Sequence, residues 1–306
     1  MLYKVVVFGV KDTTEKIVEY IQENICKVDL VVTISQAVLN KNQVSGFKGL
    51  SFLTEKYGIP VREVDSYALK DSATLSFFAE NEFDIGISMG WQRLIPKEVL
   101  DRFKYGVFGF HGNCGYLPFG RGRSPMNWSM IKGDTRFILN LFQYDEKADS
   151  PNIFANEMCA INPHDTIRSM QYKNIISSKN LIKKLLTAYA EGKVTVRRES
   201  KDFDSWYEKR TAEDGKIDFH GRTRDIYNLI RGVTAPFPGA FAYCKDKKVT
   251  VWEAVPFDEM LDFSAYAPGE VIEVFDGFPI VRTVDGSLLI RRYETEGELM
   301  PGDVLV

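Results

Sequence analysis

Short apolar runs alternate with amphipathic segments over the first two thirds of the chain, and this alternation restricts the fold more than any other feature. Residues 3–9 form a β-branched run typical of a strand buried on both faces. Ile17, Ile21 and Ile25 then repeat at helical spacing, and a second apolar run covers residues 30–34. The pattern predicts a Rossmann-like α/β fold, in which helices cover both faces of a mostly parallel sheet.

The same alternation continues to about residue 191. We expect strands at 84–88, 106–111 and 137–143 and helices at 72–82, 96–103, 125–132 and 165–191. Ligands of such sheets bind at the carboxyl ends of the strands. Polar residues that follow these strands are therefore the first candidates for a functional site.

The pattern of the sequence changes near residue 202. One more helix is expected at 222–231, and it precedes short apolar runs separated by Asp-Lys, Asp-Gly and Pro-Gly turns. This pattern predicts a smaller, β-rich domain that resembles an OB-like barrel. We place a catalytic domain at residues 1–200 and the β-domain at 201–306, a division that suits 306 residues.

The charge balance narrows the class of partner. The chain carries 39 Lys and Arg against 42 Asp and Glu, a net charge of −3. No general positive field attracts a nucleic acid, and a small, locally recognised substrate is favoured. No run approaches the roughly 18 apolar residues that span a bilayer, and we expect a cytoplasmic protein with no membrane partner.

His111 is the strongest candidate for chemistry. It lies between glycines directly after an apolar strand, where it could act as a general acid or base. His164 and His220 lie in ordinary loop sequence. Because the histidines and the four cysteines form no cluster with metal-ligand spacing, we expect no metal site.

Two further polar loops could complete a site. The first is rich in glycine and enters a helix through Ser-Pro; its candidate residues are Arg121, Gly122, Arg123 and Asn127, which could bind an anionic group or form a solvated basic turn. The second loop follows the strand at 137–143 and contains Asp145 and Asp149. A carboxylate there could hold a histidine in one tautomer, although acidic loops are usually just solvated.

Several separated segments together resemble one family, and the likeness extends over nearly the whole chain. They are DIGISMGWQRLIPKEVL, LPFGRGRSPMNW and KADSPNIFA, followed by EKRTAEDGKIDF and IYNLIRGVTAPFPGAF. In this order they resemble the folate-dependent formyltransferases, a family that includes methionyl-tRNA formyltransferase and the sugar-nucleotide N-formyltransferases. The resemblance implies transfer of a formyl group from N10-formyltetrahydrofolate to an amine.

The resemblance also implies a catalytic trio, Asn-x-His with a later Asp. The histidine is then His111 and the carboxylate Asp149, but Gly109 stands where the family has its asparagine. Two extra residues before Leu117 allow a second alignment, in which Asn113 takes the histidine position. We prefer the first alignment, so that Asn113 or a backbone N–H replaces the missing amide.

The folate pocket and the acceptor follow from the same resemblance. The residues implied for the folate are Met89, Gly90, Trp91, Arg93, Leu94, Ile95 and Asp145, although Trp91 is as easily a core residue. The mild acidity of the chain favours a nucleotide-linked amino sugar of surface polysaccharide synthesis over tRNA. Methionyl-tRNA, an amino-acid or hydroxylamine acceptor, and a noncatalytic folate or nucleotide-sugar binding protein remain alternatives. A homodimer is left open, since symmetric dimers are common among soluble enzymes.

Overall fold

The computed structural model describes residues 4–42, 44, 46–145, 152–198 and 203–306. It divides into two compact units, each assembled from three stretches of chain. Unit 1 comprises Met1–Gly122, Ile138–Cys159 and Lys173–Trp206, and unit 2 comprises Arg123–Phe137, Ala160–Tyr172 and Tyr207–Val306. The domain limit expected at residues 200 and 201 lies outside the described residues and stays a prediction.

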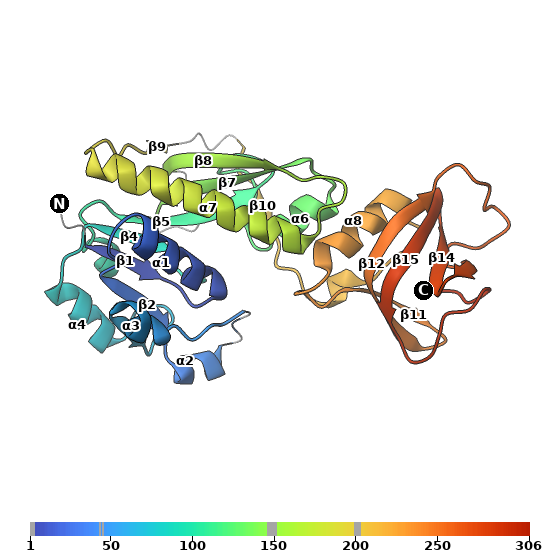
Figure 1. Cartoon of the computed structure of the whole chain (residues 1–306), viewed down its shortest axis with the longest axis horizontal. Helices are drawn as coiled ribbons and strands as arrows, with labels where there is room; N and C mark the ends of the chain where they lie inside the picture. Colours follow the sequence, from blue (N-terminus) through green and yellow to red (C-terminus); the bar gives the residue numbers. More distant parts are fainter. Residues whose placement is uncertain (1–3, 43, 45, 146–151, 199–202) are drawn as a thin grey trace. The chain divides into compact units, whose positions relative to one another are not determined.

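Unit 1 is built on an eight-stranded sheet of order β3-β2-β1-β4-β5-β7-β8-β9 (Figure 1). The strands are β1 (Val5–Phe8), β2 (Leu30–Ile34), β3 (Val61–Val64), β4 (Ile85–Ser88), β5 (Val107–Asn113), β7 (Arg136–Gln143), β8 (Asn152–Ala160) and β9 (Arg197–Arg198). The first five pair in parallel, whereas β5–β7 and β8–β9 are antiparallel. The mostly parallel, Rossmann-like sheet is therefore confirmed.

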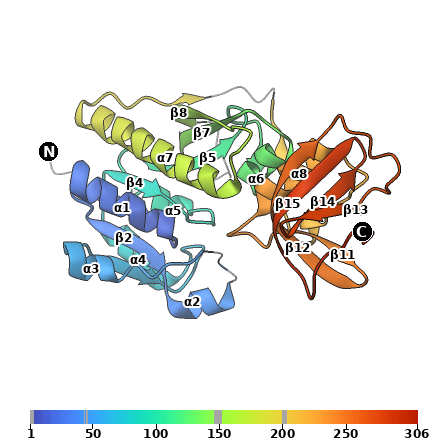
Figure 2. The same cartoon turned by 45° about the vertical axis from the view of Figure 1, so that its right-hand side comes forward.

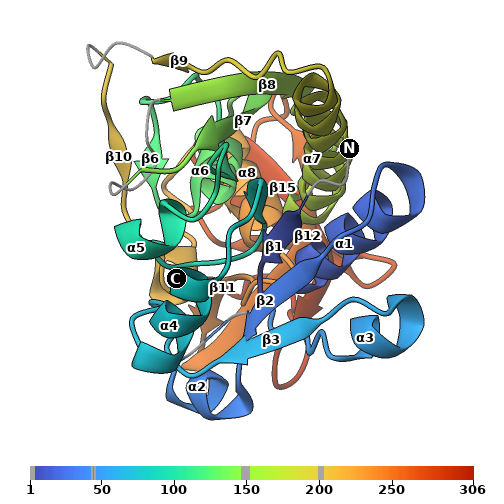
Figure 3. The ribbon, with the colours of Figure 1, turned by 90° about the vertical axis from the view of Figure 1, so that its left-hand side faces the viewer.

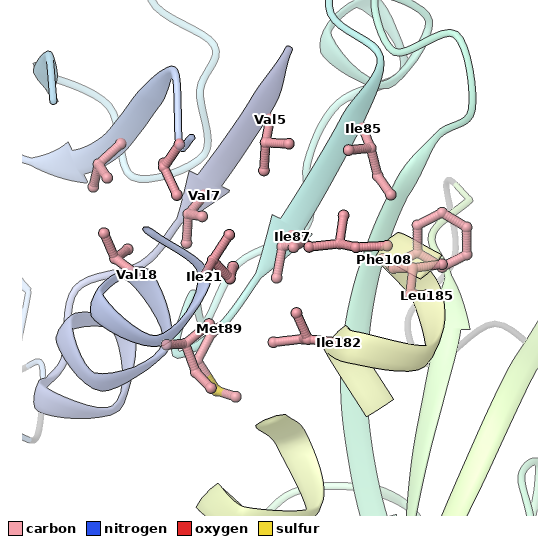
Figure 4. Packing of buried hydrophobic residues seen from close by; sticks show 14 of the residues in the cluster. Val5, Val7, Val18, Ile21, Ile85, Ile87, Met89, Phe108, Ile182 and Leu185 are labelled. Atoms are coloured by element: carbon pink, nitrogen blue, oxygen red, sulfur yellow. The ribbon is translucent and has the colours of Figure 1, made fainter. Parts of the chain in front are cut away.

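Helices cover both faces of this sheet, as the sequence predicts (Figure 3). Side chains of α1 (Asp12–Asn24), α3 (Phe52–Tyr57) and α7 (Ile167–Ala190) share one apolar core with β1 and β4. Figure 4 shows the part of this core that lies between α1 and α7. On the other face, α2 (Gln36–Lys41), α4 (Ser72–Glu80) and α5 (Lys97–Leu100) pack over a second core.

The turn after β1 is tied to the segment after β4. Lys11 donates its backbone N–H to Thr14 Oγ1 at 3.1 Å, which caps the start of α1. Thr14 Oγ1 in turn donates to the carbonyl of Met89 at 2.6 Å. Gly9 allows this close approach, since a Cβ atom there would lie 2.2 Å from Met89 O. The two loops at this sheet edge are thus held together.

Unit 2 combines helices with an antiparallel sheet of order β11-β12-β15-β14-β13 (Figure 2). Its strands are β11 (Ala240–Cys244), β12 (Lys247–Asp258), β13 (Val271–Phe275), β14 (Phe278–Thr283) and β15 (Gly286–Glu294). Helix α8 (Thr223–Val233) packs on this sheet through Ile226 and Ile230. Helix α6 (Pro125–Ile131) lies against α8, with Ile131 close to Gly232. The expected β-rich C-terminal part is confirmed.

The remaining elements are short. They are β6 (Arg121–Gly122), which pairs with β10 (Trp206–Tyr207), and a 3-10 turn at Glu213–Gly215. Within the residues that the structure describes, no helix has the length and apolar character needed to cross a bilayer.

Candidate active site

The polar candidate residues of unit 1 lie at the carboxyl ends of β4 and β5. Ser88 pairs with Gly109, the last register position that the two strands share, and β5 then continues alone beside β7 as far as Asn113. Alternate residues of a strand face the same side of a sheet. Gly109, His111 and Asn113 therefore share one face, in a row along the end of β5.

His111 is buried, with 7% of its surface exposed, and it contacts the loop before β6. Its Nε2 lies 2.6 Å from the carbonyl oxygen of Gly120. Because a carbonyl oxygen only accepts hydrogen bonds, Nε2 must carry the hydrogen. The loop is fastened in turn, since Gly120 donates its N–H to Ser205 Oγ at 2.8 Å. The ring is thus held in a defined orientation.

Asn113 is fully buried and holds the same loop at two further points. Its Nδ2 donates to the carbonyl of Phe119 at 2.7 Å, and its Oδ1 accepts from the N–H of Gly115 at 2.5 Å. Both polar atoms of the amide therefore bind loop backbone. The structure brings His111 and Asn113 together, and the catalytic role expected for Asn113 stays a prediction.

The space above Gly109 is filled by an aromatic ring. A Cβ atom at Gly109 would lie between 2.1 and 2.3 Å from Cε1, Cζ and Oη of Tyr144. The Tyr144 hydroxyl reaches beyond β5 and donates to Ser88 Oγ on β4 at 3.2 Å. Glycine is therefore required at this position as long as the tyrosine ring crosses the strand.

The sequence analysis missed a pair of hydrogen-bonded amides beside His111, one of which is fully buried. Asn140 on β7 is directly opposite His111 and has no exposed surface. Its Nδ2 donates to the backbone carbonyl of His111 at 3.1 Å, and its Oδ1 accepts from Asn156 on β8 at 3.0 Å. An asparagine within an apolar strand was the available signal, because buried amides need partners.

The segment expected to contact the folate has buried and exposed members. Met89, Trp91 and Ile95 are buried in the two cores, whereas Arg93 and Leu94 are exposed. Gly90 has a positive φ of 79°. The sharp turn at this glycine leaves the main chain of the segment at the sheet edge, where a flat heterocycle could contact it.

Tyr67 packs against the segment at residues 89–95. Its ring lies edge-on to Trp91 at 4.9 Å between centroids, and its hydroxyl accepts from the N–H of Gln92 at 3.1 Å. Burial raises the pKa of Tyr67, so the hydroxyl stays protonated. The Arg93 guanidinium lies 5.0 Å from the centre of the same ring. Trp91 is thus a core residue that also shapes the segment.

Lys11 is a second residue that the sequence analysis missed. Its side chain packs beside Gly90, where a Cβ atom would lie 3.2 Å from Lys11 Cβ and Cγ. Burial lowers the pKa of the Lys11 ammonium, and the charge of Asp12 partly opposes this shift. A partly desolvated amine beside a predicted ligand segment is a further candidate contact.

The two arginines of the glycine-rich loop have different surroundings. Arg121 has a side chain only 11% exposed, forms an ion pair with Asp204 at 3.4 Å and lies 5.5 Å from the ring centre of Trp206. The adjoining Gly122 completes β6. Arg123 belongs to unit 2 and is exposed, and its backbone N–H donates to the carbonyl of Tyr207 at 3.1 Å. The role of either arginine in anion binding stays a prediction.

Asn127 lies in unit 2 and lines a small cavity there. The cavity has a volume of about 150 Å³ and is lined by Ser124, Asn127, Arg210, Thr211, Ala212, Gly215, Val233, Phe237, Pro238 and Gly239. Asn127 Nδ2 donates to the carbonyl of Gly232 at 2.8 Å, which joins α6 to the end of α8. Asn127 therefore has a structural role.

Of the two predicted carboxylates, Asp145 is half-buried directly after Tyr144, and Asp149 lies outside the described residues. Within the described part of the chain, no group of three or more His, Cys, Asp or Glu side chains could hold a metal ion. His220 lies beside Asp218, at 3.2 Å, on an exposed turn of unit 2.

Comparisons with known proteins agree with this fold. A family model described as "Formyl transferase" matches residues 3–185, and one described as "Formyl transferase, C-terminal domain" matches residues 209–304. A curated relative, the bifunctional polymyxin resistance protein ArnA of Wigglesworthia glossinidia brevipalpis, is 31% identical over 199 residues. The match covers 65% of this chain and 29% of ArnA, so the chain spans about three tenths of that protein.

Solved structures with low sequence identity share the fold. WlaRD, a sugar 3N-formyl transferase crystallised with dTDP and 5-N-formyl-THF, has a TM-score of 0.67 and 16% identity over 98% of this chain and all (100%) of that one. An N-formyltransferase from Helicobacter canadensis, in complex with folinic acid and dTDP-3-aminofucose, has a TM-score of 0.68 and 17% identity. The match covers 94% of this chain and 98% of that one. HypX from Aquifex aeolicus, in complex with tetrahydrofolic acid, has a TM-score of 0.64 and 17% identity. The match covers 97% of this chain and 45% of HypX.

Proposed function

Because the chain belongs to the formyl transferase family, we propose that it is an N-formyltransferase that moves a formyl group from N10-formyltetrahydrofolate to a nucleotide-linked amino sugar. The observation that carries the proposal is that both family models match in order along one chain. The polar residues at the ends of β4 and β5 support it, since ligands of parallel sheets bind at that edge.

The chemistry requires charge stabilisation and proton transfer. The acceptor nitrogen forms a bond to the formyl carbon and loses a proton, while the bond from that carbon to N10 breaks and N10 gains a proton. Negative charge develops on the formyl oxygen in between. Preorganised donors at such an oxygen are typically worth about 3–4 kcal/mol each. A fixed histidine and a nearby carboxylate are groups suited to these tasks.

We assign the acid and base roles to His111 and Asp149. His111 carries a hydrogen on Nε2 and lies at the sheet edge, with its orientation fixed by Gly120. Asp149 is proposed to stabilise the protonated ring and to accept the surplus proton of the amine. The segment at residues 89–95, with Asp145, is proposed to hold the formyl donor.

The acceptor is proposed to be an amino sugar carried on a nucleotide, of the 4-amino-4,6-dideoxyhexose type, used in surface polysaccharide synthesis. Two similar structures were solved with dTDP or a dTDP-linked amino sugar. Arg121, Gly122, Arg123 and Asn127 are the residues proposed for the nucleotide side. The net charge of −3 makes tRNA the weaker candidate. We also propose that the reaction takes place in the cytoplasm.

The test is a direct assay. The purified protein is incubated with N10-formyltetrahydrofolate and a panel of nucleotide-linked 3-amino and 4-amino sugars, and mass spectrometry detects the mass gain of one formyl group. Methionyl-tRNA is assayed in parallel. Formylated tRNA without formylated sugar would overturn the proposed acceptor. No product together with no binding of folinic acid would overturn the function itself.

A further inference from the structure

We propose that Tyr144 is a catalytic residue, whose phenolic hydroxyl donates a hydrogen bond to the formyl oxygen during transfer. The proposal rests on the proposed function, because it assigns one more donor to the same reaction. It also explains why Gly109 can stand where an asparagine is expected. The position of the ring, the partner of its hydroxyl and its spacing from His111 along the strand support this role.

Backbone pairing fixes where the tyrosine begins. Tyr144 directly follows β7, and its N–H donates to the carbonyl of Val107 at 2.8 Å. Gln143 is opposite Phe108, so Tyr144 is next to Val107 and on the same face as it. From there the side chain extends diagonally across β5 towards β4.

The ring then takes the volume above Gly109. A Cβ atom at Gly109 would lie 2.3 Å from Tyr144 Oη, so the hydroxyl itself occupies the space of a side chain at that position. His111 is two residues further along the same face, which is about 7 Å along a strand. The hydroxyl and the imidazole are thus spaced like two neighbouring side chains of one strand face.

Ser88 gives the hydroxyl a fixed partner. Its Oγ is 3.2 Å from Tyr144 Oη, and the serine is only 3% exposed. A hydroxyl can accept one hydrogen bond while it donates another. In this structure the phenol donates to Ser88. When a substrate oxygen is bound, Ser88 can donate to Tyr144 instead, and the phenol directs its own hydrogen at the substrate.

Asn113 is less suited to this task. Its amide nitrogen and oxygen both bind backbone atoms of the loop at residues 115–119. To serve as a donor to the substrate, Asn113 would have to leave both backbone partners, whereas Tyr144 would redirect a hydrogen bond between two hydroxyl groups. The geometry therefore favours the tyrosine.

The first test is Tyr144→Phe, which keeps the ring and its packing. We expect kcat to fall by about 100- to 1,000-fold, the usual effect of removing one such donor, with the Kd of folinic acid changed by less than about threefold. Tyr57→Phe is the matched control, since Tyr57 also donates to a side chain, Glu23, but lies on α3.

A second measurement does not depend on the acceptor. Infrared spectra of bound N10-formyltetrahydrofolate, labelled with carbon-13 in its formyl group and measured without acceptor, should show a weaker hydrogen bond in Tyr144→Phe, as a higher carbonyl stretching frequency. An unchanged frequency together with near-normal kcat would overturn the assignment of Tyr144 alone. A wild-type protein that binds no folate would overturn the proposed function as well, which separates the two failures.

A rescue variant tests the location of the donor. Tyr144→Ala vacates the space above the strand, and adding Gly109→Asn places an amide there. We expect the double variant to recover at least about tenfold of the kcat lost by Tyr144→Ala, since an amide N–H is also an effective donor. A double variant no more active than Tyr144→Ala would mean that no donor acts from this position.

Discussion

His111 donates a hydrogen bond from Nε2 to the backbone carbonyl of Gly120, 2.6 Å away, and so joins the end of β5 to the loop that leads into β6. The residue proposed for proton transfer therefore also organises the loop. These two roles can be separated, because an amide side chain can replace the hydrogen bond but cannot exchange protons.

We predict that His111→Ala and His111→Gln both lower kcat by at least about 100-fold, the usual size of an acid–base contribution. Only His111→Ala should loosen the loop, at a cost near 1 kcal/mol for the lost hydrogen bond. Hydrogen exchange at the Gly120 amide measures the second effect. Activity within a few-fold of the wild type in both His111→Ala and Asp149→Ala would show the catalytic assignment to be wrong.

Gly109→Ala should destabilise the protein by about 1–3 kcal/mol, the range for added volume in a packed site. The cause is the Tyr144 ring, which lies 2.1 Å from the new Cβ atom. Urea denaturation measures the change, and Gly49→Ala is the control because nothing lies within 4 Å of its added Cβ. If Tyr144→Ala does not relieve the effect of Gly109→Ala, the clash is not its source.

Arg123→Ala should raise the KM for the nucleotide-linked acceptor by about tenfold or more, because a hydrogen bond to a charged group is worth roughly 1.5–3 kcal/mol. Arg121→Ala should have a smaller effect on this KM and a larger effect on stability, since Asp204 and Trp206 already engage that guanidinium. Steady-state kinetics with varied acceptor, beside thermal melting of both variants, distinguishes them. An acceptor KM raised by Arg121→Ala but not by Arg123→Ala would reverse the assignment.

Asp303 should give unit 2 a pH-dependent part of its stability. Hydrogen bonds from Lys245 and from the N–H of Met300 hold the pKa of this carboxyl below its ordinary value of 3.8. A carboxyl group whose pKa is lower in the folded than in the unfolded state stabilises the protein at pH values above its unfolded-state pKa. This contribution is lost as the pH falls through the lower, folded-state pKa. The carboxylate contribution is therefore complete at neutral pH and declines below about pH 4.

Asp303→Asn should thus melt several degrees below the wild type at pH 7, and the difference should shrink in acid below about pH 4. Thermal melts at several pH values measure it. Asp276→Asn, at a turn of the same sheet, serves as the comparison. A difference that stays constant down to acidic pH would point to lost packing instead of lost charge.

The sheet of unit 1 could be predicted because its central strands are nearly continuous apolar runs, as at Val5–Phe8 and Ile85–Ser88. Strand β8 was missed, since Asn152–Ala160 mixes polar and apolar residues and is only partly buried. Periodicity reveals a strand when one or both faces are uniformly apolar, and β8 has neither.

The candidate site was only partly predictable for a different reason. His111 and Asn113 stand out in the sequence because glycines and polar residues follow an apolar strand. The close contact between Gly109 and Tyr144 cannot be recognised in the sequence, because it joins residues far apart in sequence through a ring that crosses a strand. Such contacts depend on strand order and side-chain direction, which no local pattern contains.

The arrangement of α6 against α8 limits how the molecule can be dissected. The two helices belong to the same unit but come from separate stretches of chain, residues 123–137 and 207–306. A fragment that starts at residue 207 would leave Gly232 and its neighbours on α8 without the cover of Ile131, exposing apolar surface to water. Simple truncation therefore removes part of what it aims to isolate, and a gene fragment that preserves this unit must also carry residues 123–137 and 160–172 on added linkers.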